Sequence, residues 1–196
     1  MKKFSEDFLR IICKSKVTGS FEPFMSGEIK DVVKYIKRIL GELKAENKIL
    51  VNADFDSYGS GFASYVDVSI SNQNKSDTTI TFNGNKKTEW TKGLSIYVSK
   101  LCPFWFVGGS EWTVTFESEK RIGGSSGFLR PESVHLIDKA LWQIKIDKIQ
   151  RIFAGFGYSL LSEEDVNKSL WFDVSIPTIL AGKQYQIFDC FFYWED

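Results

Sequence analysis

Few residues of this chain combine the types and the spacing that metal binding requires. Asn52, Asp54 and Asp56 place oxygen ligands at alternate positions of the segment NADFDSYGSG, as the start of a calcium-binding loop does. Counted from Asp54, the twelfth position is Tyr65, so the carboxylate that would complete such a loop is missing. Zinc has no set of histidine and cysteine ligands at suitable spacing. The sequence therefore predicts neither a metal site nor a cofactor.

The histidine content argues against acid–base catalysis. The single histidine, His135, lies between Val134 and Leu136 near the expected start of a helix, and no G-x-S-x-G motif accompanies it. A surface histidine is the simpler interpretation, and we predict no catalytic residue.

Paired carboxylates leave one enzymatic alternative open. Two acids flanking a glycosidic bond can hydrolyse it, and tryptophan rings can stack on sugars. The predicted strands offer acids at Asp54, Asp56, Asp67, Glu111 and Glu117, and tryptophans at Trp90, Trp105 and Trp112. Their spacing specifies no pair.

The elements that must position these residues centre on the stretch 90–116. Leu94, Ile96 and Val98 alternate with polar residues, and the stretch 112–117 alternates again, which is typical of strands with one buried face. Gly108 and Gly109 predict a turn between them. Asn83-Gly84 predicts a second, tight turn. The glycine- and serine-rich stretch 121–127 is expected to be a linker, and 185–194 a final aromatic strand.

Two amphipathic helices are expected beside the strands. From Ile29 to Leu43, apolar residues recur every three or four positions with lysines largely opposite, which predicts about five helical turns capped by Ser26 and ending near Asn47. Pro131 predicts the first turn of the second helix. Its expected apolar stripe comprises Val134, Ile137, Leu141 and Ile144, continued by Ile149, Ile152, Phe153 and Phe156.

These elements predict the fold class. We expect a single α+β domain over residues 1–196, with one antiparallel-rich sheet of five or six strands packed against two long amphipathic helices. The short segment 4–13 could be a helix or a strand.

Composition narrows the classes of function. Lysine plus arginine number 25 and aspartate plus glutamate also 25, so the clustered positive charge typical of nucleic-acid binding is not expected. No stretch has the roughly 18 apolar residues of a membrane span. Three widely separated cysteines, Cys13, Cys102 and Cys190, suggest reduced thiols. We therefore expect a cytoplasmic protein that binds neither nucleic acid nor membrane.

The last forty residues are the most distinctive part of the sequence. GYSLL, WFDVSIPTIL and IFDCFFYWED resemble small uncharacterised proteins of Gram-positive bacteria, of the type suspected to be immunity proteins of polymorphic toxins. The resemblance rests on Trp171, Phe172, Asp173, Pro177, Phe188, Asp189, Phe192, Tyr193, Trp194 and Asp196. It implies a toxin protein as the partner and carries no assigned functional residue.

The expected function is therefore non-enzymatic binding of a cognate toxin by a preformed surface. Aromatic residues dominate the energetics of protein interfaces, and Trp112, Tyr193 and Trp194, with Glu195, are the predicted partner contacts. Two alternatives stay open. One is a hydrolase that acts on a carbohydrate or small polar substrate through paired carboxylates, and the other is a structural protein that forms a homodimer. The chain could be a monomer or a homodimer.

Overall fold

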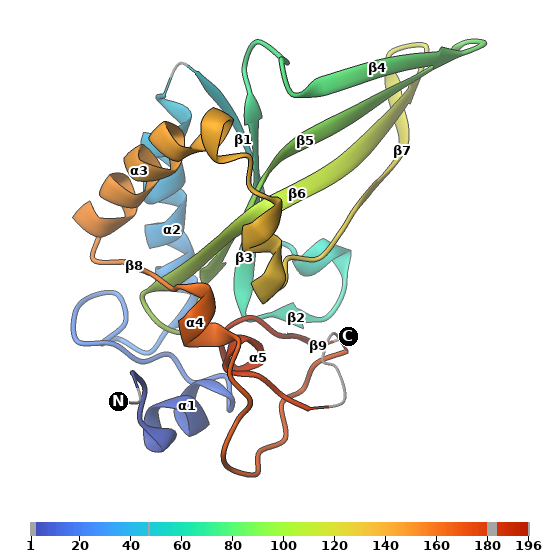
Figure 1. Ribbon diagram of the computed structural model, residues 1–196. Helices are drawn as coiled ribbons and strands as arrows, with labels where there is room; N and C mark the ends of the chain where they lie inside the picture. Colours follow the sequence, from blue (N-terminus) through green and yellow to red (C-terminus); the bar gives the residue numbers. More distant parts are fainter. Residues whose placement is uncertain (1–2, 47, 180–183, 196) are drawn as a thin grey trace.

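A computed structural model describes residues 3–46, 48–179 and 184–195. Within this part of the chain the α-helices are α1 (Glu6–Ile12), α2 (Ile29–Lys44), α3 (Lys139–Gly155), α4 (Glu163–Val166) and α5 (Ile187–Phe191), labelled in Figure 1. The 3₁₀ helices are η1 (Ser57–Gly59) and η2 (Pro131–Leu136). The strands are β1 (Ile49–Asp54), β2 (Phe62–Ala63), β3 (Tyr65–Asn72), β4 (Thr78–Asn83), β5 (Lys86–Ser99), β6 (Phe104–Glu117), β7 (Lys120–Ser126), β8 (Ser159–Leu160) and β9 (Trp194–Glu195).

The main sheet is built around two long strands, β5 and β6, of 14 residues each. Its path is β1-β3-β5-β6-β7, all antiparallel; β4 pairs with β5 beyond the end of β3, and β8 pairs in parallel with β6. Strands β2 and β9 form a separate two-stranded sheet. The α+β prediction of one antiparallel-rich sheet with two long helices is thus confirmed, and the sheet has seven strands.

One face of the sheet packs against α2 and α3. Val66, Val68 and Ile70 alternate along β3 and point to this side, where they join the buried residues of both helices. The ring of Trp105 on β6 stacks on Phe153 of α3 with centroids 4.6 Å apart. Figure 1 shows the two helices side by side on this face. Alternation along the strands therefore sends the intervening residues to the opposite face.

The opposite face is covered only at one end. There α1, α5 and the C-terminal residues bury a second core around Tyr97, Phe106 and Phe192. The paired strands β4 to β7 extend beyond this core as a projecting arm, which is visible at the upper right of Figure 1. Consequently, the middle of this face is left uncovered, and polar residues line it.

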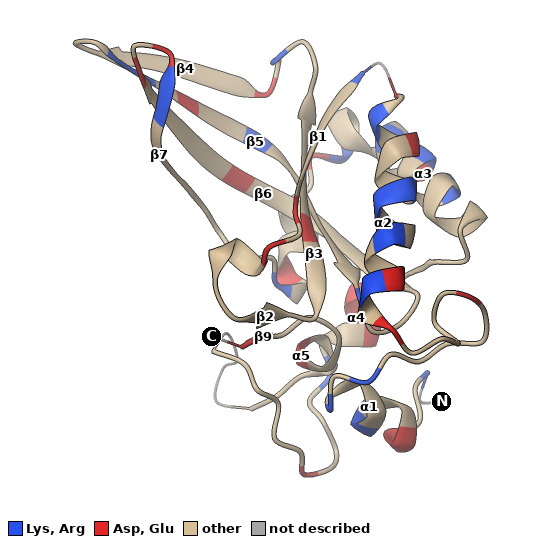
Figure 2. Cartoon of the chain, turned by 180° about the vertical axis from the view of Figure 1, so that it is seen from behind, with Lys and Arg blue, Asp and Glu red and all other residues tan. Residues whose placement is uncertain are grey.

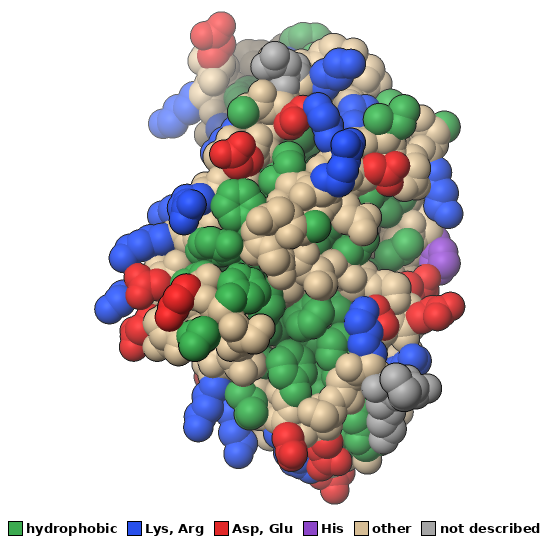
Figure 3. Space-filling view, turned by 90° about the vertical axis from the view of Figure 1, so that its left-hand side faces the viewer, with side chains coloured by type: hydrophobic (Ala, Val, Ile, Leu, Met, Phe, Trp, Pro, Cys, Tyr) green, Lys and Arg blue, Asp and Glu red, His purple; other side chains and the backbone are tan. Residues whose placement is uncertain are grey.

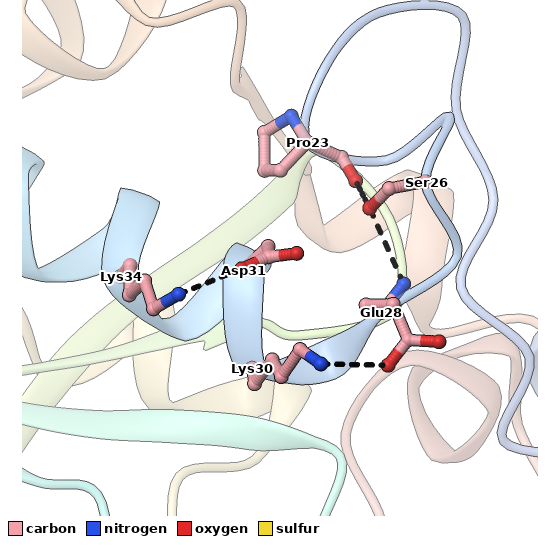
Figure 4. Close-up of polar contacts among 6 residues, drawn as sticks. All are labelled: Pro23, Ser26, Glu28, Lys30, Asp31 and Lys34. Atoms are coloured by element: carbon pink, nitrogen blue, oxygen red, sulfur yellow. Dashed lines mark hydrogen bonds and ion pairs between the residues drawn. The ribbon is translucent and has the colours of Figure 1, made fainter.

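Helix α2 confirms the predicted amphipathic helix, although its cap differs. Its buried side comprises Val32, Ile36, Ile39, Leu40 and Leu43. Basic residues mark its outer side in Figure 2. Ser26 does not cap the helix: its Oγ donates to the carbonyl of Pro23 and accepts from the amide of Glu28, so it stabilises the turn before the helix (Figure 4). The helix ends at Lys44, and the predicted end at Asn47 lies outside the described residues.

The second predicted helix is interrupted. Residues 131–136 form η2, and α3 begins at Lys139 because Asp138 caps it by accepting a hydrogen bond from the amide of Leu141. The buried stripe of α3 is accordingly Trp142, Ile146, Ile149 and Phe153. The stripe predicted through Ile144 was wrong, since the Ile144 side chain is 81% exposed. Figure 3 shows the side on which α2 and α3 lie, with hydrophobic side chains gathered in the middle of the face.

The predicted turn at Gly108 and Gly109 is also wrong, because both lie inside β6. A Cβ on Gly108 would lie 2.5 Å from the Cβ of Ser133, and one on Gly109 would lie 2.5 Å from the backbone of Leu136. The glycines let η2 pack directly against the part of β6 that lies between its pairings with β7 and β8.

Two further predictions need correction. The expected linker at 121–127 is mostly strand β7, which pairs with β6 after a turn at Ser118 and Glu119. Half of the expected final strand at 185–194 is helix α5, because Gln186 and Asp189 form a reciprocal cap that starts a helix; only Trp194 lies in a strand, β9. The tight turn at Gly84 is confirmed: Asn83 pairs with Lys86, and Gly84 has a φ of +61°.

Candidate functional site

The uncovered middle of the sheet forms a groove, which we call the sheet groove, of about 570 Å³. It is lined by the end of β1 with the segment that follows it, and by residues of β3, β5, β6 and β7. The two sides of the groove meet at one end, where the rings of Tyr58 and Phe128 lie 5.7 Å apart and Trp194 packs on both. The curled sheet therefore presents a cavity that is open to solvent and closed at one end by aromatic rings.

A half-buried carboxylate, that of Asp67 on β3, lies in the sheet groove. Its Oδ1 accepts a hydrogen bond of 3.0 Å from Oγ of Ser95, and its Oδ2 accepts one of 2.8 Å from Oη of Tyr58. Burial raises the pKa of this carboxyl to about 6; the two hydrogen bonds lower it, and the charge of Asp54 raises it. Asp67 is thus held in one orientation and titrates close to neutral pH.

The segment after β1 positions Tyr58. Asp54 accepts hydrogen bonds from the amide of Asp56 at Oδ1 and from the amide of Tyr58 at Oδ2. Ser57 and Tyr58 have φ values of +52° and +58°, a left-handed conformation that is costly for residues with a Cβ. Both oxygens of Asp54 are therefore engaged in holding a strained turn, and this turn directs the phenol of Tyr58 to Asp67.

The wall of the groove on β6 carries Trp112. Thr91 faces Trp112 in the register and Ser110 faces Gly93, so these residues share one side of the sheet with Ser95. The indole lies over Gly93: a Cβ there would be 2.5 Å from Cη2 of Trp112 and closer still to the carbonyl oxygen of Ile70. The absence of a side chain at Gly93 therefore leaves the space that the indole occupies.

A buried lysine, Lys100, interacts with the acids at the end of β1 and in the segment that follows it. Lys100 follows β5 and is 4% exposed, with its ammonium 5.5 Å from the centre of the Phe62 ring. Burial lowers the pKa of Lys100 to about 8, against the opposing charges of Asp54 and Asp56. The charges of these two carboxylates favour the protonated form of Lys100.

The four predicted partner contacts have different surroundings. Trp112 lines the sheet groove, and Trp194 packs at its closed end, where its Nε1 donates to the carbonyl of Ser60. Glu195 is exposed beside it on β9. Tyr193 is fully buried in the second core, and its hydroxyl lies 2.6 Å from Oγ of Ser15. As the chain is folded, Tyr193 can therefore influence a partner only by supporting its neighbours.

The other chemical candidates lie apart from one another. His135 is 69% exposed at its side chain and lies 3.0 Å from Oε1 of Glu163. Glu111 pairs with Lys92 on the surface. The three cysteines are free and buried. In the described part of the chain, no group of three or more histidine, cysteine, aspartate or glutamate residues is arranged to hold a metal ion.

Sequence reasoning included Asp67 only as one of several acids, and it missed Tyr58 and Ser95. One signal was present: Asp67, Ser69 and Ser95 are polar positions whose direct neighbours in sequence (Val66, Val68, Ile70, Leu94 and Ile96) are all apolar. The pattern marks a polar face, but it does not reveal that Tyr58 reaches back to Asp67 from a turn.

Comparisons with known proteins do not add to this description. No protein-family model matches the sequence, and neither the search of curated proteins nor that of solved structures finds a match. Among the described residues, no helix is both long and apolar enough to span a membrane.

Proposed function

We propose that this protein binds another protein through the sheet groove and its aromatic end, and that the partner is a toxin which the bound chain neutralises by covering it. The observation that carries the proposal is the groove itself: a preformed cavity of about 570 Å³ with an indole along one wall and rings at its closed end. The toxin as partner comes from the resemblance of the C-terminal residues to suspected immunity proteins.

The hydrogen bonds of the acids favour binding over hydrolysis. Both oxygens of Asp54 accept backbone amides, and both oxygens of Asp67 accept hydroxyl groups. A catalytic pair needs one carboxylate free to protonate a leaving group and another free to attack or to activate water. Asp54 and Asp67 are instead held as fixed acceptors, which suits recognition of a complementary surface.

The proposed mode of binding follows from the shape of the groove. A protruding segment of the partner would enter it and pack on Trp112, while the surface around Trp194 and Glu195 would contact the partner beside the groove. A stable complex of this type buries about 1,600 Å² in total, with the central aromatic residues contributing most of the affinity and the charged rim adding specificity.

Growth rescue tests this proposal. The product of the reading frame beside this chain's gene, which the proposal takes to be the toxin, is expressed in a bacterial host with and without the chain, and colony formation is counted. Wild type should restore growth, and Trp112→Ala should lose most of the rescue. Trp90→Ala is the matched control. Trp90 lies on β5 and is paired with Thr113, the neighbour of Trp112 on β6, but it lines no part of the groove. If wild type fails to rescue growth, or if both variants rescue equally, the proposal is wrong.

A second candidate function is hydrolysis of a carbohydrate or small polar substrate. The observation in its favour is that the pKa of Asp67 is raised to about 6, which lies in the range of a general acid, in a groove that also contains Trp112. Release of nitrophenol from a panel of nitrophenyl glycosides would support it if Asp67→Asn abolished the activity. An equal background rate in both proteins would exclude these glycosides.

The molecular mass of the protein in solution distinguishes the homodimer alternative from a monomer. Light scattering across a hundredfold range of protein concentration would give the mass of one chain for a monomer and twice that mass for a dimer.

A further inference from the structure

The charged residues of the sheet groove are predominantly acidic. Asp54, Asp56 and Asp67 line it, against one basic residue, Arg121. None of these four residues takes part in an ion pair within the described part of the chain. The whole protein has balanced charge, so this excess of acidic side chains is a local property of the groove lining, although the buried Lys100 interacts electrostatically with Asp54 and Asp56.

The carboxylate of Asp67 still has acceptor capacity. A carboxylate has about four lone-pair positions, and the hydroxyl groups of Tyr58 and Ser95 occupy one on each oxygen. These two hydroxyl groups fix the orientation of the carboxylate and leave it able to accept further hydrogen bonds from a ligand in the groove. Because the group is half-buried, a cation that reaches it is partly removed from water, which strengthens the pairing.

The indole of Trp112 extends this site along the groove. Trp112 lies over Gly93, which is two residues from Ser95 on the same side of β5, and Ser95 is hydrogen-bonded to Asp67. The indole and the carboxylate therefore lie on the same side of the sheet, with Gly93 and Ser95 between them. A long aliphatic side chain with a terminal cation matches both parts, since its stem would pack on the indole and its charge would reach Asp67.

We propose that the sheet groove receives a lysine side chain from a protruding segment of the partner protein, with its stem along Trp112 and its ammonium hydrogen-bonded to Asp67. This inference rests on the proposed function, because it names the chemical group by which the partner is recognised. It also predicts a basic residue at the tip of the partner's inserted segment.

The test uses the full chain and two small probes of nearly equal shape, N-acetyl-lysine methylamide and N-acetyl-norleucine methylamide. Each is titrated into the protein while the indole N–H resonance of Trp112 and the backbone amides of β3 and β5 are followed by NMR. The lysine probe should bind at least about tenfold more tightly than the norleucine probe and should shift the Trp112 and Asp67 signals. Equal affinities, or shifts located outside the groove, would overturn the proposal.

Variants provide the second part of the test. Asp67→Asn should weaken binding of the lysine probe about tenfold and leave the weak binding of norleucine unchanged. Asp147→Asn is the matched control, because Asp147 is an exposed carboxylate on α3, and it should bind both probes as wild type does. Growth rescue that depends on Trp112 together with no preference for lysine would leave the proposed function standing and reject the lysine site.

Discussion

The phenol of Tyr58 donates a hydrogen bond of 2.8 Å to Oδ2 of Asp67, and so connects the turn after β1 to the carboxylate in the groove. Tyr58 reaches this position from a left-handed backbone conformation, held by Asp54. The two aspartates therefore have different roles: Asp54 shapes the turn, and Asp67 is presented to the groove.

Tyr58→Phe removes this hydrogen bond and should lower the free energy of unfolding by about 1–2 kcal/mol at pH 8, where Asp67 is ionised. It should also raise the pKa of Asp67 above its wild-type value of about 6, because a hydrogen bond to the charged form is lost. Urea unfolding and NMR titration of the Asp67 carboxyl carbon measure the two effects. The control is Tyr35→Phe, which loses the hydrogen bond that Tyr35 donates to the carbonyl of Phe156. This contact does not involve Asp67, so the variant should not change the Asp67 titration. An unchanged titration in Tyr58→Phe would contradict the assignment.

Asp67→Asn should stabilise the protein at high pH. The folded-state pKa of about 6 lies above the ordinary value of 3.8, so the folded state binds the proton more tightly than the unfolded state. Ionisation of Asp67 therefore lowers the free energy of unfolding. The decrease develops as the pH rises from about 4 to about 6, and it persists at higher pH. The full difference corresponds to about 3 kcal/mol; solvent in the groove reduces it to about 1 kcal/mol.

Urea unfolding at pH 4 and pH 8 measures this effect in both proteins. The difference in unfolding free energy between variant and wild type should be about 1 kcal/mol more favourable to the variant at pH 8 than at pH 4. The other charged or titratable groups around Asp67 are Asp54, Tyr58, Tyr65, Tyr97 and Arg121, and they are unchanged in the variant. A variant whose difference from wild type is the same at both pH values would show that burial does not penalise the Asp67 charge. A residue that costs stability where it is ionised is better explained by binding than by folding.

Gly93→Ala should damage the groove wall. The added Cβ would collide with the carbonyl oxygen of Ile70 and with the Trp112 ring, so the unfolding free energy should fall by about 1–3 kcal/mol, and the indole should move. Gly41→Ala is the matched control: it lies in α2 with no atom within 4 Å of the new Cβ, and it should gain about 0.5–1 kcal/mol. Thermal unfolding and the Trp112 fluorescence spectrum report the two effects. Equal stability changes in the two variants would contradict the packing of Trp112 on Gly93.

Tyr193→Ala separates a core role from a contact role. Removal of this buried ring should lower the free energy of unfolding by about 3–5 kcal/mol, as removal of other large aromatic side chains from protein cores does. Trp194→Ala removes a partly exposed ring and should cost less, about 1–2 kcal/mol, while weakening partner binding more at temperatures where both variants are folded. Chemical unfolding followed by circular dichroism gives the ranking. A Tyr193→Ala protein as stable as wild type would show that the tyrosine is not a core residue.

The sequence predicted the fold class because its periodic patterns were long. Alternation in β3, β5 and β6 and the stripe of α2 each involve several apolar residues, and burial of those residues decides the fold. Two of the errors arose because glycine occurs in turns and also at close backbone contacts within strands. Gly108 and Gly109 indicated a turn but serve the close approach of η2, and the glycines at 123 and 124 indicated a linker but lie in an edge strand.

The candidate site was less accessible to sequence analysis. Trp112, Asp54 and Asp67 could be named because they are chemically distinctive residues on predicted strands, and strand pairing places these three on one face. The pairing of Tyr58 with Asp67 could not, because it depends on a left-handed turn whose conformation Asp54 imposes through two backbone hydrogen bonds. Tyr193 was assigned to a contact because the aromatic residues at 191–194 cannot be divided into buried and exposed ones until α5 is recognised as a helix.

Calorimetric titration of the purified product of the neighbouring reading frame, which we propose to be the toxin, into this chain is the most direct test of binding through the groove. Wild type and Trp90→Ala should bind it one to one with equal affinity, and Trp112→Ala should bind at least about tenfold more weakly. Absence of binding by wild type, or equal affinity for all three proteins, would contradict a function that resides in the sheet groove.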